Sequence, residues 1–198
     1  FPTRRSSDLY LERVLDKGYE ALLLTDPVDE WVTQSLTTFK EKPLQSLSQA
    51  DLDLDSEEEK KVKDETKKTQ TDLYSTLIEK LKTSLESRIK DVVISSRLKS
   101  TPACLVNDVN DPSHQMEKIL SRIQPDAQAP TVKRILEINP DHPVIERMRT
   151  MAETQQIRWA ELLYNQALLI EGSPLPDPTK FSQTVSELMM EASGGPNA

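Results

Sequence analysis

The apolar positions of residues 154–171, TQQIRWAELLYNQALLIE, cover more than one face of a helix. A surface helix normally buries a single apolar stripe about 100° wide. A helix with two apolar faces needs a partner on each side. We therefore expect the rest of the domain to cover one face and a second copy of the chain to cover the other. Gly172 follows the pattern and suits a left-handed C-cap.

Further helices are predicted by capping residues and by spacing. Residues 11–19 form a short helix closed by Gly18. Asp26 caps a helix that has Pro27 in its first turn and runs to about residue 39. A long helix covers about 56–87, with leucines at four-residue steps in its second half, and further helices cover 111–123, 143–148 and 178–192. The docking leucines are Leu73, Leu77, Leu81 and Leu85.

Short runs rich in apolar and β-branched residues predict strands between these helices. Residues 20–25, EALLLT, are typical of a buried parallel strand, and residues 89–95, 103–106 and 134–139 predict three more. The pattern predicts an α+β fold that is mostly helical with a small mixed sheet.

The patterns divide the chain into five parts. We expect residues 1–9, FPTRRSSDL, to be a non-native scar, because they are polar and lack the apolar core of a signal peptide. The parts that follow are the end of an α/β domain at 10–40, a linker at 41–55, a second domain at 56–192 and a disordered tail at 193–198.

Composition excludes several classes of partner. Among 198 residues the net charge is −8, which argues against binding to nucleic acid or to an anionic membrane surface. No apolar run approaches the roughly 20 residues that cross a bilayer. One cysteine excludes an internal disulfide and fits a reducing compartment, so we expect a cytoplasmic protein.

Residues that could carry catalysis are sparse. The four glycines form no phosphate-binding loop, and His114 and His142 each lie beside a proline-marked helix start. Cys104 lies in an apolar run and is expected to be a buried, unreactive thiol. Asp26 and Asp29, with the neighbouring Glu30, are better explained by helix capping than by a catalytic carboxylate pair. We expect no catalytic, cofactor-binding or metal-binding residue in this chain.

Two other features leave a functional interpretation open. Trp31 is either buried in its domain or exposed for binding. Met116, Ile119 and Leu120 form a stripe that faces either the core or a partner, and methionine suits adaptable apolar surfaces.

Several blocks in order resemble the bacterial HtpG branch of the heat-shock protein 90 chaperone family, from residue 10 to about residue 192. These blocks are GYEALLLTDPVDEW, SRLKSTPACLV, HQMEKIL, LEINPDHPVI and WAELLYNQALL. The resemblance places residues 10–40 at the end of the family's middle domain and residues 56–192 in its C-terminal dimerisation domain.

The resemblance implies an ATP-driven dimeric clamp that binds non-native client proteins. It implies that ATP and Mg²⁺ bind in an N-terminal domain outside this chain, and that the last two helices of each protomer form a four-helix bundle. The client contacts would be Trp31, Gln34, Met116, Ile119 and Leu120, although Gln34 and Pro112 depart from the family pattern. The implied dimer interface comprises Ile157, Trp159, Leu162, Leu163, Leu168, Leu169, Phe181, Val185, Leu188 and Met189.

Two alternatives remain beside this interpretation. A structural or adaptor homodimer without client binding would share the dimer helices but bury the Met116 stripe. An enzyme would need a cluster of titratable groups, which the sequence does not offer.

Overall fold

A computed structural model describes residues 14, 17–24, 26, 28–44, 57–96, 98–108, 111 and 132–193. Of residues 30, 34 and 57–64 it describes the backbone and not the side chains. Its centre is a three-stranded mixed sheet of β3 (Ile89–Ile94), β4 (Ala103–Val106) and β5 (Arg134–Ile138). The strand order is β3-β5-β4, and β5 runs parallel to β3 and antiparallel to β4. The three strands confirm the α+β prediction and lie at the predicted positions.

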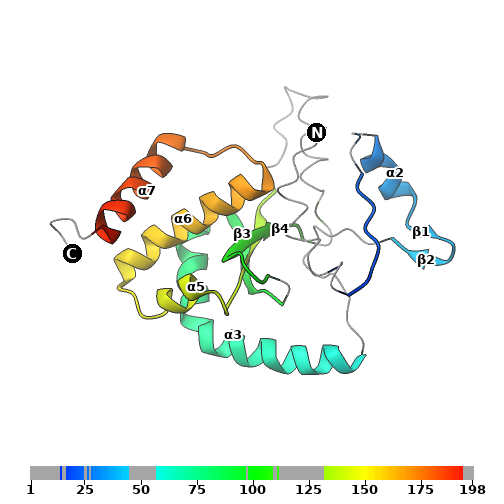
Figure 1. The fold of residues 1–198 in the computed structure, drawn as a ribbon, viewed down its shortest axis with the longest axis horizontal. Helices are drawn as coiled ribbons and strands as arrows, with labels where there is room; N and C mark the ends of the chain where they lie inside the picture. The colour runs from blue at the N-terminus through cyan, green and yellow to red at the C-terminus, as the bar shows by residue number, and fades with distance from the viewer. Residues whose placement is uncertain are drawn as a thin grey trace.

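Four helices surround this sheet: α3 (Glu57–Leu85), α5 (Pro143–Met148), α6 (Glu153–Glu171) and α7 (Pro178–Ala192). The helix α3 packs against β3, and α6 packs against both β4 and α3. The last helix, α7, turns back and lies beside α6 (Figure 1). No helix within the described residues has the length and apolar character that a bilayer crossing requires.

The core lies between the sheet, α3 and α6. Leu77, Leu81 and Leu85 are buried there as predicted, but Leu73 is 55% exposed, so its assignment to the docking stripe was wrong. Leucines at four-residue steps drift by about 40° per step around a helix of 3.6 residues per turn. Tyr74 takes the inward position instead, and its hydroxyl donates a hydrogen bond of 2.7 Å to the carbonyl oxygen of Pro140.

Local signals set the helix ends. Gly172 ends α6 in the left-handed region, with φ of 80°. Asp177 caps α7, because its Oδ1 accepts a hydrogen bond of 2.9 Å from the backbone N–H of Lys180. His142 caps α5 through Nδ1, which accepts from the backbone N–H of Val144 at 3.2 Å.

The helix predicted after Asp26 is shorter than expected. The helix α2 spans Asp29–Ser35, and β1 (Thr38–Phe39) then pairs with β2 (Lys42–Pro43). Lys40 and Glu41 both have positive φ, the geometry of a tight hairpin turn. Asp26 does not cap α2 with its side chain as predicted; its backbone N–H donates to Oδ2 of Asp29 at 3.0 Å.

The buried strand predicted at residues 20–25 is absent. The described part of this run, Glu20–Leu24, forms no strand, and Leu22 is 77% exposed. A buried parallel strand needs neighbours on its edges and faces, and none of the described strands pairs with this run.

Several predicted segments lie outside the described residues. They are the scar at 1–9, residues 45–55 of the linker, nearly all of the helix at 111–123 with His114, Met116, Ile119 and Leu120, and residues 194–198 of the tail. Of the helix predicted at 11–19, the structure describes Val14, which is buried, and the turn at Gly18, whose φ of 73° fits the expected cap.

Candidate functional site

The helix α6 has one face inside the protomer and apolar residues on the side away from it. Ala160, Leu163 and Ala167 lie in the core. Leu169 comes nine positions after Ala160, which at about 100° per residue places it on the opposite side of the helix. Its side chain is 49% exposed. On this side, where Leu162 is buried and Arg158 meets α7, helix α6 leaves Leu169 half-exposed.

The helix α7 adds further exposed apolar residues because it buries little of its own apolar face. None of its residues is buried. Phe181, Val185 and Leu188 are half-buried, whereas Met189 is 67% exposed and Met190 is also exposed. We call the exposed large apolar side chains of these two helices the outer apolar surface; they are Ile157, Leu169, Met189 and Met190.

The ten residues of the implied dimer interface thus divide into three groups. Leu162, Leu163 and Leu168 are buried within the protomer, and Trp159, Phe181, Val185 and Leu188 are half-buried. Ile157, Leu169 and Met189 are exposed. The exposed and half-buried residues remain available to a second chain, while Leu163 and Leu168 belong to the core cluster.

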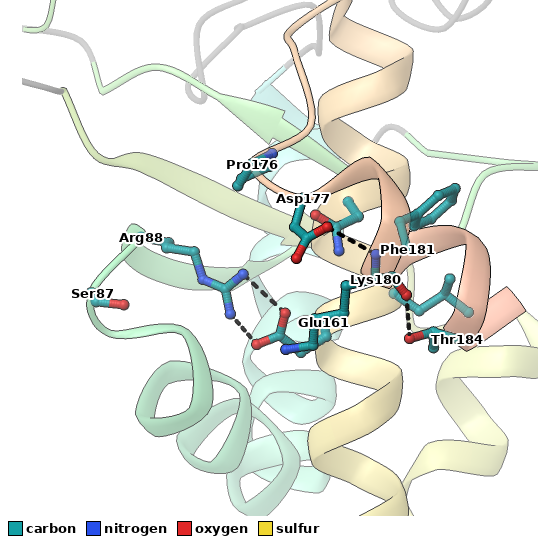
Figure 2. A pocket seen from close by; sticks show the side chains of 10 residues that line it. Ser87, Arg88, Glu161, Pro176, Asp177, Lys180, Phe181 and Thr184 are labelled. Atoms are coloured by element: carbon teal, nitrogen blue, oxygen red, sulfur yellow. Dashed lines mark hydrogen bonds and ion pairs between the residues drawn. The ribbon is translucent and has the colours of Figure 1, made fainter.

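A pocket of about 350 Å³ lies beside the first half of α7. Its walls come from the turn after α3, the middle of α6 and the start of α7 (Figure 2). Leu162, Pro176 and Phe181 contribute apolar surface, and charged and neutral polar side chains line the remainder. The lining residues are Ser87, Arg88, Glu161, Leu162, Asn165, Pro176, Asp177, Lys180, Phe181 and Thr184.

Two arginine–glutamate pairs fix α6 to the sheet side of the protomer. Arg88 meets Glu161 in a two-pronged ion pair and lies over the ring of Tyr164, with 5.1 Å between the guanidinium and the ring centroid. On β5, Nε of Arg134 lies 3.0 Å from Oε1 of Glu171, which is at the end of α6. Burial raises the pKa of the Tyr164 hydroxyl, with smaller opposing effects from Arg88 and Arg134.

A third charge cluster connects α6 with α7. Arg158 lies between two carboxylates one turn apart on α7, with Nη2 at 2.5 Å from Oε2 of Glu191 and Nη1 at 3.9 Å from Oε2 of Glu187. The hydrogen bond to Glu191 raises the pKa of Arg158, and the same bond lowers the pKa of Glu191. The sequence prediction missed this cluster, although Glu187 and Glu191 at four-residue spacing gave a partial signal.

A second exposed apolar patch lies on α2. Trp31 is 48% exposed and borders a shallow hollow with Val32, Ser35 and Leu36. Gln34 lies in the same helix, and its side chain is outside the described part. The structure brings Trp31 together with apolar neighbours on α2, while the Met116 stripe is outside the described residues.

The described residues offer little for catalysis. They contain no group of three histidine, cysteine or acidic side chains that could hold a metal ion. Cys104 is buried in β4, as the sequence predicted. His142 serves as a helix cap.

Comparison with known proteins gives a consistent result. The profile of the family described as Hsp90 protein matches residues 4–197. Proteins named "Chaperone protein HtpG" are 51% identical over 187 residues in Bdellovibrio bacteriovorus, 44% over 185 in Aromatoleum aromaticum and 41% over 186 in Geobacter metallireducens. These alignments cover 91–94% of this chain but only 28–30% of each relative, so the chain spans less than a third of their length.

Proposed function

The chain belongs to the Hsp90 family, and on this basis we propose that it supplies the dimerising end of a molecular chaperone that binds non-native proteins. The observation that carries the proposal is the outer apolar surface of α6 and α7. A helix whose two apolar faces cannot both be covered by its own domain needs a second partner. A second copy of the same chain supplies that partner with closed two-fold symmetry.

In the proposed dimer, α6 and α7 of each protomer pack into a four-helix bundle. Leu169 and Met189 lie at its centre, and the half-buried Phe181, Val185 and Leu188 become fully covered. A stable interface buries roughly 800 Å² per partner. Joining two protomers also raises the effective concentration of their client-binding surfaces, so two weak apolar contacts act together.

We assign the ATPase activity and its ATP and Mg²⁺ to the part of the longer relatives that this chain does not cover. The groups described here serve structural roles: Arg88 pairs with Glu161, and His142 caps a helix. The assembled protein would work in the cytoplasm, where the buried thiol of Cys104 stays reduced.

The Trp31 patch is the proposed client contact within the described residues. Exposed tryptophan beside Val32 and Leu36 suits unfolded segments, which expose apolar side chains without a fixed shape. Gln34, Met116, Ile119 and Leu120 complete the proposed client surface. The second candidate, an adaptor homodimer, shares the outer apolar surface but lacks client binding.

Light scattering on the 198-residue chain, diluted through the micromolar range, tests the dimer. We expect twice the monomer mass, and a shift toward monomer in Leu169→Glu and in Met189→Glu, because each buries an unpaired charge. The matched control is Leu73→Glu, which adds the same charge at an exposed leucine on α3. A monomeric wild type, or equal effects of all three variants, would contradict the proposal.

Suppression of aggregation of an unfolded protein separates a chaperone from an adaptor. Under the client-binding proposal, Trp31→Ser weakens suppression while the dimer mass is unchanged. The matched control is Leu44→Ser, which removes an exposed apolar side chain from the same region. If the wild-type chain does not suppress aggregation, the adaptor interpretation is favoured.

A further inference from the structure

The helix α7 is held weakly by its own protomer. It has 15 residues, and not one of them is buried. Isolated helices of about this length are marginally stable in water. The partial burial of Phe181, Val185 and Leu188 against the body gives α7 only part of the apolar contact that stabilises most protein helices.

Polar contacts hold α7 near its two ends, in addition to the partly buried Phe181, Val185 and Leu188. At its start, the loop from Gly172 leads into the Asp177 cap. Near its end, Arg158 of α6 reaches Glu187 and Glu191. Between these points the pocket of about 350 Å³ lies beside Lys180, Phe181 and Thr184, so the first half of α7 has space beneath it (Figure 2).

The pocket itself does not have the character of a ligand site. Arg88 and Glu161 on its wall satisfy each other with two hydrogen bonds, and the Asp177 carboxylate accepts the cap bond from Lys180. A binding site needs polar groups placed to orient a ligand, and these charged groups already have partners within the protein. We therefore interpret the pocket as space that lets α7 move.

We propose that Arg158 is an electrostatic latch, which holds α7 against α6 through Glu187 and Glu191 and releases it when the charges are screened or removed. Without Arg158, the two glutamates repel each other at four-residue spacing, which also weakens α7 itself. All three side chains are partly exposed, so salt screens their attraction. Arg158 is thus a positioning residue for the outer apolar surface.

One extension of the latch rests on the proposed function. If a second copy covers α7, dimerisation holds the helix in place even when the latch is open. Release of α7 is then expected mainly in the monomer. There the latch holds α7, and with it the outer apolar surface, in the position that a second copy would bind.

Amide hydrogen exchange of residues 178–192 in the whole chain tests the latch. In monomeric samples, we expect exchange of α7 to rise roughly fivefold in Arg158→Gln relative to the wild type, because two partly exposed ion pairs are lost. The same rise is expected in the wild-type monomer when salt increases from about 50 to about 500 mM. Exchange in α6 and β5 stays unchanged. The salt measurement requires no substitution, so it remains informative if a variant fails to fold.

Lys82→Gln is the matched control, because it removes one lysine charge from an ion pair of 2.5 Å with Asp91, far along the chain from α7. Arg158→Gln combined with Glu191→Gln should add little to either change alone. Unchanged α7 exchange in monomeric Arg158→Gln, or an equal rise in monomeric Lys82→Gln, would overturn the latch.

The mass of each sample, measured alongside exchange, separates the two proposals. If the wild type is a monomer whose α7 exchange rises with salt, the latch stands and the proposed dimer fails. If the wild type is a dimer, and diluted monomers of wild type and Arg158→Gln exchange α7 equally, the dimer stands and the latch fails.

Discussion

Arg88 and Glu161 form a two-pronged ion pair that joins the turn after α3 to the middle of α6. One prong, from Nη1 of Arg88 to Oε2 of Glu161, measures 2.9 Å, and the same guanidinium covers the ring of Tyr164. Both charged side chains are about three-quarters covered. The pair therefore sets the orientation of α6, and with it the direction in which Leu169 points.

Breaking this pair should destabilise the protomer. Arg88→Met is expected to lower the free energy of unfolding by about 1–3 kcal/mol, because Glu161 loses both hydrogen bonds in a partly covered site. Arg88→Lys keeps the charge but not the fork geometry, so it should recover only part of the loss. Urea denaturation followed by circular dichroism measures both, and wild-type stability in Arg88→Met would refute the role of the pair.

Leu163 and Leu169 should respond differently to the same substitution. The family resemblance placed Leu163 in the dimer interface, but Leu163 is 1% exposed inside the protomer. We expect Leu163→Glu to unfold the chain, and Leu163→Ala to cost about 2–5 kcal/mol. Leu169→Glu should keep the circular dichroism spectrum of the wild type. A folded Leu163→Glu would mean that α6 packs differently.

Gly172 gives a test of backbone conformation alone. A Cβ built at this position meets nothing within 4 Å, so a substitution there costs only the strain of a positive φ. Gly172→Ala should cost about 1–2 kcal/mol, and Gly172→Asn less, because asparagine tolerates the left-handed region. Thermal unfolding measures the difference, and equal stability of the alanine and asparagine variants would contradict this explanation.

Tyr74→Phe tests the buried hydroxyl of Tyr74, which bonds the carbonyl of Pro140 and also interacts with Arg149. The change removes the bond to the carbonyl of Pro140 and keeps the ring in the core. We expect a loss of about 1 kcal/mol in urea denaturation. Thr83→Val, which removes an exposed hydroxyl bonded within α3, should have a smaller effect.

Glu191 offers a test of the charge cluster by titration. Its pKa lies below the ordinary value of 4.5 because of the hydrogen bond from Arg158. A carboxylate with a lowered pKa stabilises the folded state above its unfolded pKa, and this stabilisation is lost as pH falls through the folded pKa. NMR titration of the Glu191 carboxyl carbon should show the lowered pKa in the wild type and a return toward 4.5 in Arg158→Gln.

The sequence predicted elements whose pattern is local and repeated. Strands β3, β4 and β5 and helices α3, α6 and α7 begin and end within about two residues of the prediction. Gly172 and Asp177 directly mark the end of α6 and the start of α7. The buried strand predicted at residues 20–25 was wrong, and Leu22 is exposed instead. An apolar run forms a buried strand only when neighbouring strands are present.

The sequence predicted that α6 has two apolar faces, but not which residues of the candidate site are buried. The two apolar faces of α6 follow from spacing, whereas the buried position of Leu163 and the exposed position of Leu169 depend on where the sheet lies. The partners of Arg88 and Arg158 are distant in sequence, and no local pattern identifies such pairs.

The strand order has a consequence for synthesis of the chain. Neither β3 nor β4 pairs with the other; both pair with β5, which comes last in the sequence. During translation, residues 89–106 leave the ribosome before their shared partner exists. Their backbone N–H and C=O groups cannot form the hydrogen bonds of this sheet until residues 134–138 have been synthesised. Completion of the sheet is therefore a late event, and the nascent chain exposes two unpaired strands until then.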